Sequence, residues 1–358
     1  MSTPTTGSST TPTTDWPDGR SEHDPGGRPG SRPASQAALL RQVASSPAVV
    51  GLLAVLTALF LSSILILAAD SEVRYTATYL LNRPGDFLHA TASTLSEAYS
   101  SLLRGAVFDW RATTGVRMIR PITDTLTNAT PLIIAGLGMA VAFRAGLFNI
   151  GGQGQMILGA ITACYVGIAW NLPPVAHLLL AVVGAALGGL VWGGIAGVLK
   201  ARTGANEVIV TIMLNSIAAH LLSQVLSLKA FNGEGETGNR KSLTVADTAQ
   251  YPWLAGDSFR LHAGFLLALL VAVAVWWLME RSRLGFQLRA TGLNADAART
   301  AGMSVPWVTS LVMMISGALC GLAATAPVLG TQKSMDESVV GTIGFDAITV
   351  ALLGRSRP

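Results

Sequence analysis

Charged residues are scarce in this chain. Only 12% of its 358 residues are Asp, Glu, Lys or Arg, whereas half are apolar, and soluble domains carry about 25% charged residues. Cysteine is almost absent as well. Cys164 and Cys320 both lie inside apolar runs, which argues against a disulfide framework or a metal cluster and favours two buried packing residues. The net charge of +4 is spread over the polar segments, so it indicates membrane topology and no nucleic-acid surface.

The apolar residues are gathered in runs of about 20, the length that crosses a bilayer as a helix. We therefore predict an all-α, polytopic membrane protein with about seven complete transmembrane helices and a partial one at the C-terminal end. The expected spans are Ala48–Ala69, Asn128–Phe143, Leu147–Trp170, Val175–Leu199, Glu207–Ser227, His262–Met279 and Val308–Leu329, followed by the shorter apolar segment Ile343–Gly354. Glycines at GxxxG spacing, in 184–197 and at Gly317 and Gly321, predict close helix contacts.

The segments outside these spans set the topology. Residues 1–46 are rich in Ser, Thr, Pro and Gly, so we expect a disordered tail, and we treat 47–358 as one transmembrane domain. Strict alternation of the spans places most loop arginines and lysines on one side, which is then cytoplasmic and includes the N-terminal tail. Residues 70–128, expected as an external loop with interfacial helical pieces, run against this rule because they contain six arginines: Arg74, Arg83, Arg104, Arg111, Arg117 and Arg120.

A polar break interrupts the apolar sequence at residues 148–155, where Asn149, Gln153 and Gln155 alternate with glycines. Such backbone survives at membrane depth only when it is buried in protein or lines a wet cavity, so we predict a discontinuous helix near 144–155. The residues could form the wall of a transport pathway or a polar knot that pairs helices. A phosphate loop is excluded, because no Lys-Ser/Thr pair follows the glycines.

A second polar feature lies on the span Glu207–Ser227. Glu207, Thr211 and Asn215 fall on one helix face, within an arc of about 80° at 100° per residue. Asn215 lies deepest, where a polar residue indicates function by default, whereas Glu207 also fits a simple role at the helix N-terminus. His220 lies on a different face, and we interpret it as a hydrogen-bonded packing residue.

A third feature is a short helix in the basic loop 280–305. Asn294 is a good N-cap, residues 295–301 favour helix, and Gly302 is a good C-terminal stop. A short helix bounded in this way can dock into a groove of a partner protein. It can equally be an ordinary loop that lies on the membrane surface.

Three blocks of sequence resemble one family. They are residues 136–160 (GLGMAVAFRAGLFNIGGQGQMILGA), 206–218 (NEVIVTIMLNSIA) and 284–305 (LGFQLRATGLNADAARTAGMSV), and residues 344–358 are similar to the start of a further block. The chain resembles the permease subunit of bacterial ABC importers of the branched-chain amino acid, ribose and nucleoside type, closest to the general nucleoside branch. The resemblance covers roughly residues 125–358. The family continues with further spans beyond the last block, so we expect that this permease domain is incomplete at its C-terminal end.

The resemblance implies a pore subunit of the bacterial cytoplasmic membrane with no catalytic role and no cofactor or metal of its own. ATP would be used by cytoplasmic ATPase partners, together with a second permease subunit and an extracellular substrate-binding lipoprotein. The pathway candidates are Asn149, Gln153, Gln155, Thr211 and Asn215. The ATPase-coupling candidates are Gly285, Arg289, Gly292, Asn294, Ala297, Ala298 and Gly302.

The expected activity is ATP-driven import of nucleosides, with simple sugars or branched-chain amino acids as the alternative substrates. A secondary transporter driven by an ion gradient is the competing class. It would need a charged residue deep within a span, and the acidic candidates Glu207 and Asp346 both lie near the ends of apolar segments. An intramembrane enzyme would need a catalytic set on facing positions, and no such set is evident in the sequence.

Overall fold

The computed structural model describes residues 47–233 and 240–356, so the expected tail 1–46 lies outside the described residues. The described chain is overwhelmingly helical, which confirms the all-α prediction, with one antiparallel pair of two-residue strands. The elements are α2 (Pro47–Ala69), α3 (Ser71–Ala77), α4 (Pro84–Ala106), α5 (Gly115–Arg144), α6 (Gly152–Ala169), α7 (Pro174–Thr203), α8 (Glu207–Leu226), β1 (Asn232–Gly233), β2 (Lys241–Ser242), η1 (Asp247–Ala249), α9 (Gly264–Arg281), α10 (Arg283–Leu293), α11 (Ala295–Thr300), α12 (Val305–Ala323), the π-helix η2 (Ala326–Thr331) and α13 (Ile343–Leu353).

Six helical segments of the described chain are long and apolar enough to cross a membrane: α2, α5, α7, α8, α9 and the segment of α12 and η2. These segments confirm a polytopic membrane protein. The expected third span corresponds to α6, an 18-residue helix that falls outside this set because Gln153 and Gln155 lower the hydropathy of its first turn. The C-terminal apolar segment forms the 11-residue helix α13.

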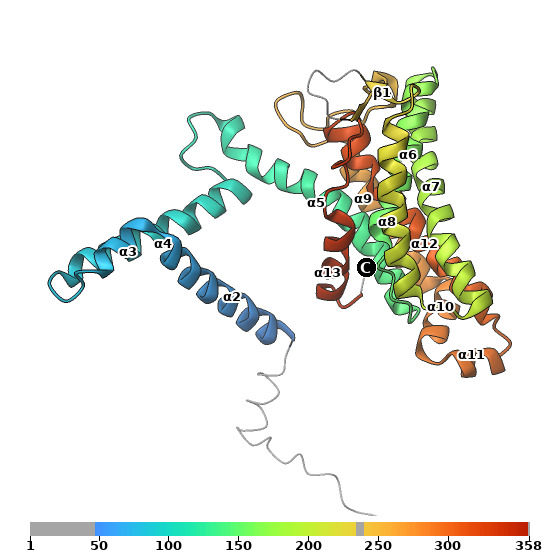
Figure 1. The fold of residues 1–358 in the computed structure, drawn as a ribbon, viewed down its shortest axis with the longest axis horizontal. Coiled ribbons are helices and arrows are strands. Elements are labelled where there is room, and N and C mark those ends of the chain that lie inside the picture. The colour runs from blue at the N-terminus through green and yellow to red at the C-terminus, as the bar shows by residue number, and fades with distance from the viewer. Residues whose placement is uncertain (1–46, 234–239, 357–358) are drawn as a thin grey trace, which may run out of the picture. The chain divides into compact units, whose positions relative to one another are not determined.

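The chain divides into two compact units, residues 1–96 and 97–358. In the described part of the first unit, α2 is apolar on every side, and no residue of its apolar stretch is buried by protein. This is expected for a helix surrounded by lipid. The second unit holds α5 to α13 as one bundle. Figure 1 shows β1 at one end of this bundle and α10 and α11 at the other end.

The prediction for the second span was wrong in its length. The sequence suggested a short span from Asn128 to Phe143, but α5 is a continuous helix of 30 residues that begins at Gly115. It contains Pro121 and Pro131 without ending at either of them. The expected external loop 70–128 is accordingly mostly helical, and the predicted amphipathic piece within it corresponds to α4.

Glycines bring α7 and α12 into backbone contact along the centre of the bundle. A Cβ atom on Gly189 would overlap the carbonyl oxygen of Gly317 and approach Gly321, and one on Gly193 would meet Met313 and Gly317. Such small residues allow van der Waals packing at short distance, the main source of helix association in lipid. The predicted close helix contact at the GxxxG glycines is therefore confirmed. Cys164 and Cys320 are both buried and unpaired, as predicted.

Two segments of non-helical backbone lie directly before α6 and α13. Residues 145–151 connect α5 to α6, and residues 332–342 connect η2 to α13. The second segment is held at the β1 end of the bundle, because the Ser242 N–H donates to the Met335 carbonyl oxygen at 2.7 Å and the Val245 N–H donates to that of Lys333 at 2.9 Å. The first segment leads into α6, whose first turn is mostly buried, whereas in the first turn of α13 only Gly344 is buried.

Candidate functional site

The centre of the candidate site is the side chain of Asn149, which is fully buried in the break between α5 and α6. Its Nδ2 donates to Gln155 Oε1 at 3.1 Å and to Ser316 Oγ of α12 at 2.9 Å, and its Oδ1 accepts from the Gly151 N–H at 2.8 Å. Ser316 lies 11 residues into α12, about 16 Å along the helix. The break therefore carries its polar network to the middle of the bundle.

The polar face of α8 packs against the same break. Asn215 donates from Nδ2 to the Ile150 carbonyl oxygen at 2.9 Å, and its Oδ1 accepts from the Gly154 N–H at 2.8 Å. These two backbone groups flank the start of α6, where the helix itself provides no partners. Thr211 is buried one turn earlier and lies where a Cβ on Gly151 would touch it. The predicted stripe is thus a single face of α8, and it holds the broken backbone in place.

Glu207, the third residue of the stripe, is the first residue of α8. It pairs with Lys200 near the end of α7 at 2.5 Å, while Asn206 forms the N-cap of α8. The interpretation of His220 as a packing residue was wrong, because α8 presents this side chain to its exposed side.

Gln153 connects the break to the second non-helical segment. Its Nε2 donates to the Gly341 carbonyl oxygen at 2.7 Å, and its Oε1 accepts from the Gly344 N–H at 3.2 Å. Unlike Asn149 and Gln155, which are buried, Gln153 is partly exposed. Among the three polar residues of the predicted break, Gln153 is therefore the one that is not fully enclosed by protein.

Gly341, which accepts the hydrogen bond from Gln153, lines a cavity of about 360 Å³ between α5, η2 and the segment that precedes α13. None of its lining residues is charged, and several offer neutral polar groups. The lining consists of Thr127, Asn128, Pro131, Leu132, Ala326, Pro327, Thr331, Gln332, Ser338, Val339, Val340, Gly341 and Ile343. The cavity has the size of a small-molecule site, about 300–1,000 Å³, and its mixed lining suits a neutral, polar ligand. Sequence reasoning missed it because its walls come from three separate segments.

The predicted short helix is confirmed at the opposite end of the bundle. The Asn294 Oδ1 accepts from the Asp296 and Ala297 N–H groups, both at 3.0 Å, as an N-cap of α11, and Gly302 follows the helix with a φ of +83°. The sequence analysis missed α10, which precedes α11 directly. Its signal was Ser282, whose Oγ accepts from the Gly285 N–H at 2.9 Å as the N-cap of α10.

Gly292, one of the coupling candidates on α10, contacts the backbone where α5 ends and the break begins. A Cβ on Gly292 would overlap the carbonyl oxygen of Arg144, and one on Gly146 would lie 3.2 Å from the Gly292 Cα. In addition, Glu280 of α9 pairs with Arg144 Nη1 at 2.6 Å and with Arg289 Nη1 at 3.8 Å. Backbone contact and ion pairs therefore both join α10 to residues 144–146.

The coupling candidates differ in what their side chains can reach. Ala298 is 3% exposed, and a Cβ on Gly285 would meet the backbone of α9, so these two residues position the helices and offer no side chain to a partner. Asn294, Ala297 and Gly302 lie on the exposed side. The sequence analysis missed Leu293, whose apolar side chain is 89% exposed at the junction of α10 and α11.

Comparison with known proteins covers all of these residues. The family model described as branched-chain amino acid transport system / permease component matches residues 122–358. The chain is 42% identical to the guanosine ABC transporter permease protein NupP of Bacillus subtilis over 65% of this chain and 67% of NupP. It is 38% identical to the glucose ABC transporter permease protein TsgB13 of Haloferax volcanii, over 66% of this chain and 64% of that relative.

The nucleoside ABC transporter permease protein NupB of Lactococcus lactis is 32% identical over 67% of this chain and 68% of NupB. The chain thus spans about two thirds of the length of these relatives. No solved structure matches it. The break, the α8 face and the α10–α11 end all lie inside the matched region, and the chain belongs to the family of the branched-chain amino acid transport system permease component.

Proposed function

We propose that this chain is the permease subunit of an ATP-driven importer that carries nucleosides across the cytoplasmic membrane. The observation that carries this proposal is the 42% identity to the guanosine permease NupP, and the 32% identity to the nucleoside permease NupB supports it. Six membrane-spanning segments in the described chain supply the transmembrane body that the role requires.

The neutral cavity beside Gln153 fits this class of substrate. Nucleosides carry no charge at neutral pH, and they offer hydroxyl groups and a base edge for hydrogen bonding. Asn128 and Gln332 line the cavity with amides that both donate and accept, and Pro131 and Pro327 add apolar surface for a ring. A site of this kind needs only transient contacts when a separate binding protein selects the substrate.

A simple sugar is the second candidate substrate, because the glucose permease TsgB13 is 38% identical to this chain. Sugars are also neutral and rich in hydroxyl groups, so the same lining suits them. Nucleosides differ in their planar base, which would gain from the proline surfaces of the cavity.

The proposed mechanism transmits motion from the α10–α11 end to the cavity. Cytoplasmic ATPase partners would dock on the exposed side of α11 and on Leu293, so this end of the bundle would lie on the cytoplasmic side. The distribution of positive charge in the sequence favours the same side for the N-terminus. Their closure would move Gly292 against residues 144–146, and the break would then shift the hydrogen bonds of Asn149, Gln155, Thr211 and Asn215. Gln153, which bonds to Gly341 of the cavity lining, would open or close the pathway. A second permease subunit and an extracellular binding lipoprotein complete the proposed assembly.

Uptake in cells tests the proposal. The chain is expressed with its ATPase and binding lipoprotein, and uptake of radiolabelled guanosine is compared with that of glucose. We expect ATP-dependent guanosine uptake that glucose does not inhibit. The variants Asn128→Leu and Gln332→Leu should reduce it, whereas Glu337→Gln, outside the cavity lining, should not. Glucose uptake alone would establish the sugar alternative. Uptake that survives ATP depletion and collapses with the proton gradient would refute an ATP-driven importer.

A further inference from the structure

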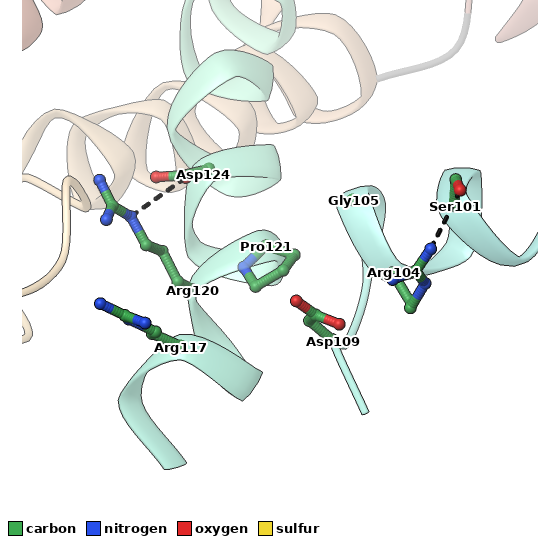
Figure 2. Close-up of a pocket in the computed structure, with 8 residues that line it drawn as sticks. All are labelled: Ser101, Arg104, Gly105, Asp109, Arg117, Arg120, Pro121 and Asp124. Carbon is green, nitrogen blue, oxygen red and sulfur yellow. Dashed lines mark hydrogen bonds and ion pairs between the residues drawn. The ribbon is translucent and has the colours of Figure 1, made fainter. Parts of the chain in front are cut away.

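A basic pocket lies at the junction of α4 and α5, on the part of α5 that precedes the residues lining the cavity described above. It has a volume of about 440 Å³ and is lined by Ser101, Arg104, Gly105, Asp109, Arg117, Arg120, Pro121 and Asp124. Figure 2 shows Arg117 and Arg120 on α5 and Arg104 on the end of α4, with Asp109 on the loop between these helices. We propose that this pocket binds the phosphate of an anionic phospholipid headgroup.

The charge of the pocket is incompletely balanced. It contains three guanidinium groups and two carboxylates, and only Arg120 is in an ion pair, with its Nε 3.6 Å from Asp124 Oδ2. Arg104 donates to Ser101 Oγ at 3.0 Å, but its Nε is buried without a partner. Within residues 47–233 and 240–356, neither Arg104 nor Arg117 makes an ion pair. Arginine forks with free N–H groups are the usual ligands of phosphate oxygens.

The length of α5 places this pocket at the level of the headgroups. A helix of 30 residues is about 45 Å long, whereas the hydrocarbon core is about 30 Å thick and takes about 20 residues. Counted back from Arg144, which pairs with Glu280 at the α10 end of the bundle, these 20 residues end near 125. Residues 115–124, which carry Arg117 and Arg120, extend beyond the hydrocarbon at the opposite face of the membrane.

The surroundings of the pocket favour a lipid over a soluble protein partner. Exposed apolar side chains surround it, and two of them are aromatic: Phe108 is 43% exposed and Trp110 is 49% exposed. Aromatic residues concentrate at the membrane interface. The other exposed apolar residues are Leu102, Leu103, Val107, Val116, Ile119 and Ile122. A bound phospholipid would place its acyl chains against this surface and its phosphate among the arginines.

The inference also accounts for an anomaly in the sequence. Six arginines lie in residues 70–128, on the side of the membrane where the positive-inside rule predicts few. Three of the six line this pocket. Binding of anionic headgroups would explain why these three arginines lie on this side of the membrane, which the positive-inside rule does not explain.

Native mass spectrometry of the detergent-purified full chain tests the proposal, with phosphatidylglycerol and phosphatidylcholine of identical acyl chains as the probes. We expect at least tenfold preferential retention of phosphatidylglycerol. Arg104→Gln and Arg117→Gln should each lower that preference about fivefold, because one arginine near anionic lipid contributes about the free energy of such a factor. Arg117→Lys should keep most of it, and Arg111→Gln, a neighbouring exposed arginine outside the lining, should leave it unchanged.

Melting temperatures measured without added lipid separate loss of binding from loss of folding. Equal retention of the two lipids would overturn the proposal, and so would an equal loss in Arg111→Gln. Binding of inorganic phosphate at millimolar concentration without lipid preference would identify a site for the free ion instead. Loss of binding-lipoprotein docking in Arg117→Gln, with lipid preference intact, would assign the pocket to a protein partner.

Discussion

Replacement of Asn215 by Leu tests whether the polar face of α8 holds the break in place. The Asn215 amide satisfies the Ile150 carbonyl oxygen at 2.9 Å and the Gly154 N–H at 2.8 Å. Leucine keeps the apolar character of the helix but can form neither bond. We therefore expect the first turn of α6 to loosen and both stability and uptake to fall.

The magnitude follows from the two backbone groups that lose their partners. Each buried, unsatisfied group costs about 1–3 kcal/mol, whereas an average interhelical hydrogen bond in a membrane protein contributes about 0.6 kcal/mol. The cost of about 1–3 kcal/mol for an unsatisfied group applies here, because Gly154 lies in the first turn of α6 and its N–H has no helical partner. We expect a loss of about 2–4 kcal/mol. At about 2–4 °C per kcal/mol, this lowers the melting temperature by roughly 5–15 °C.

The control is His220→Leu on the same helix, since His220 is exposed and exposed substitutions usually change stability by less than about 0.5 kcal/mol. Melting in detergent, followed by size-exclusion chromatography, and uptake of labelled nucleoside are measured for both variants. Equal shifts for the two variants would refute the role assigned to this face. So would a normal melting temperature for Asn215→Leu.

Three further predictions concern packing and coupling. Gly189→Ala should lower stability by about 1–3 kcal/mol by overpacking, whereas Gly184→Ala, whose Cβ would have its nearest neighbour at 3.4 Å, should be tolerated; detergent melting distinguishes them, and equal melting would refute the backbone contact of α7 with α12. Glu280→Gln should reduce uptake about tenfold without reducing the amount of protein in the membrane, because its ion pairs with Arg144 of α5 and Arg289 of α10 are lost. Unchanged uptake would show that these ion pairs do not couple α10 to α5. Ala298→Glu should disrupt α11 and abolish substrate-stimulated ATP hydrolysis, because Ala298 is buried. Ala297→Glu should only weaken ATPase binding in a pull-down, because Ala297 is exposed. A larger loss of ATP hydrolysis in Ala297→Glu than in Ala298→Glu would contradict this assignment.

Much of the fold could be predicted from the sequence because length and hydropathy dominate in a membrane. Apolar runs of about 20 residues located α2, α7, α8, α9 and α12 to within a few residues. The error at α5 has a clear cause. Residues 115–127 contain three polar threonines and two arginines, so hydropathy ended the span at the hydrocarbon boundary, whereas backbone hydrogen bonding continues the helix beyond it.

The candidate site was predicted in its parts and missed in its assembly. The face of α8 and the N-cap of α11 depend on local spacing, which a sequence displays directly. The partners of these residues come from distant segments: Ser316 lies 167 positions from Asn149, and Gly341 lies 188 positions from Gln153. No local pattern encodes such pairs, so the cavity beside Gln153 and the contact of Gly292 with residues 144–146 emerge only in three dimensions.

The connection between the two ends of the bundle depends on where its backbone is not helical. A continuous helix would transmit a push at Arg144 as a rigid shift of its whole length. Residues 145–151 instead form a non-helical link. It contacts Gly292 at Gly146, and its other end is held by the Asn215 side chain of α8 and by the hydrogen bond that Asn149 donates to Ser316 of α12. The amides of that network can both donate and accept, so they can form hydrogen bonds with new partners when the link shifts. In the proposed mechanism, motion at α10 would therefore reach Gln153 and its partner Gly341 in the cavity lining, while the backbone contact between α7 and α12 would hold these two helices together.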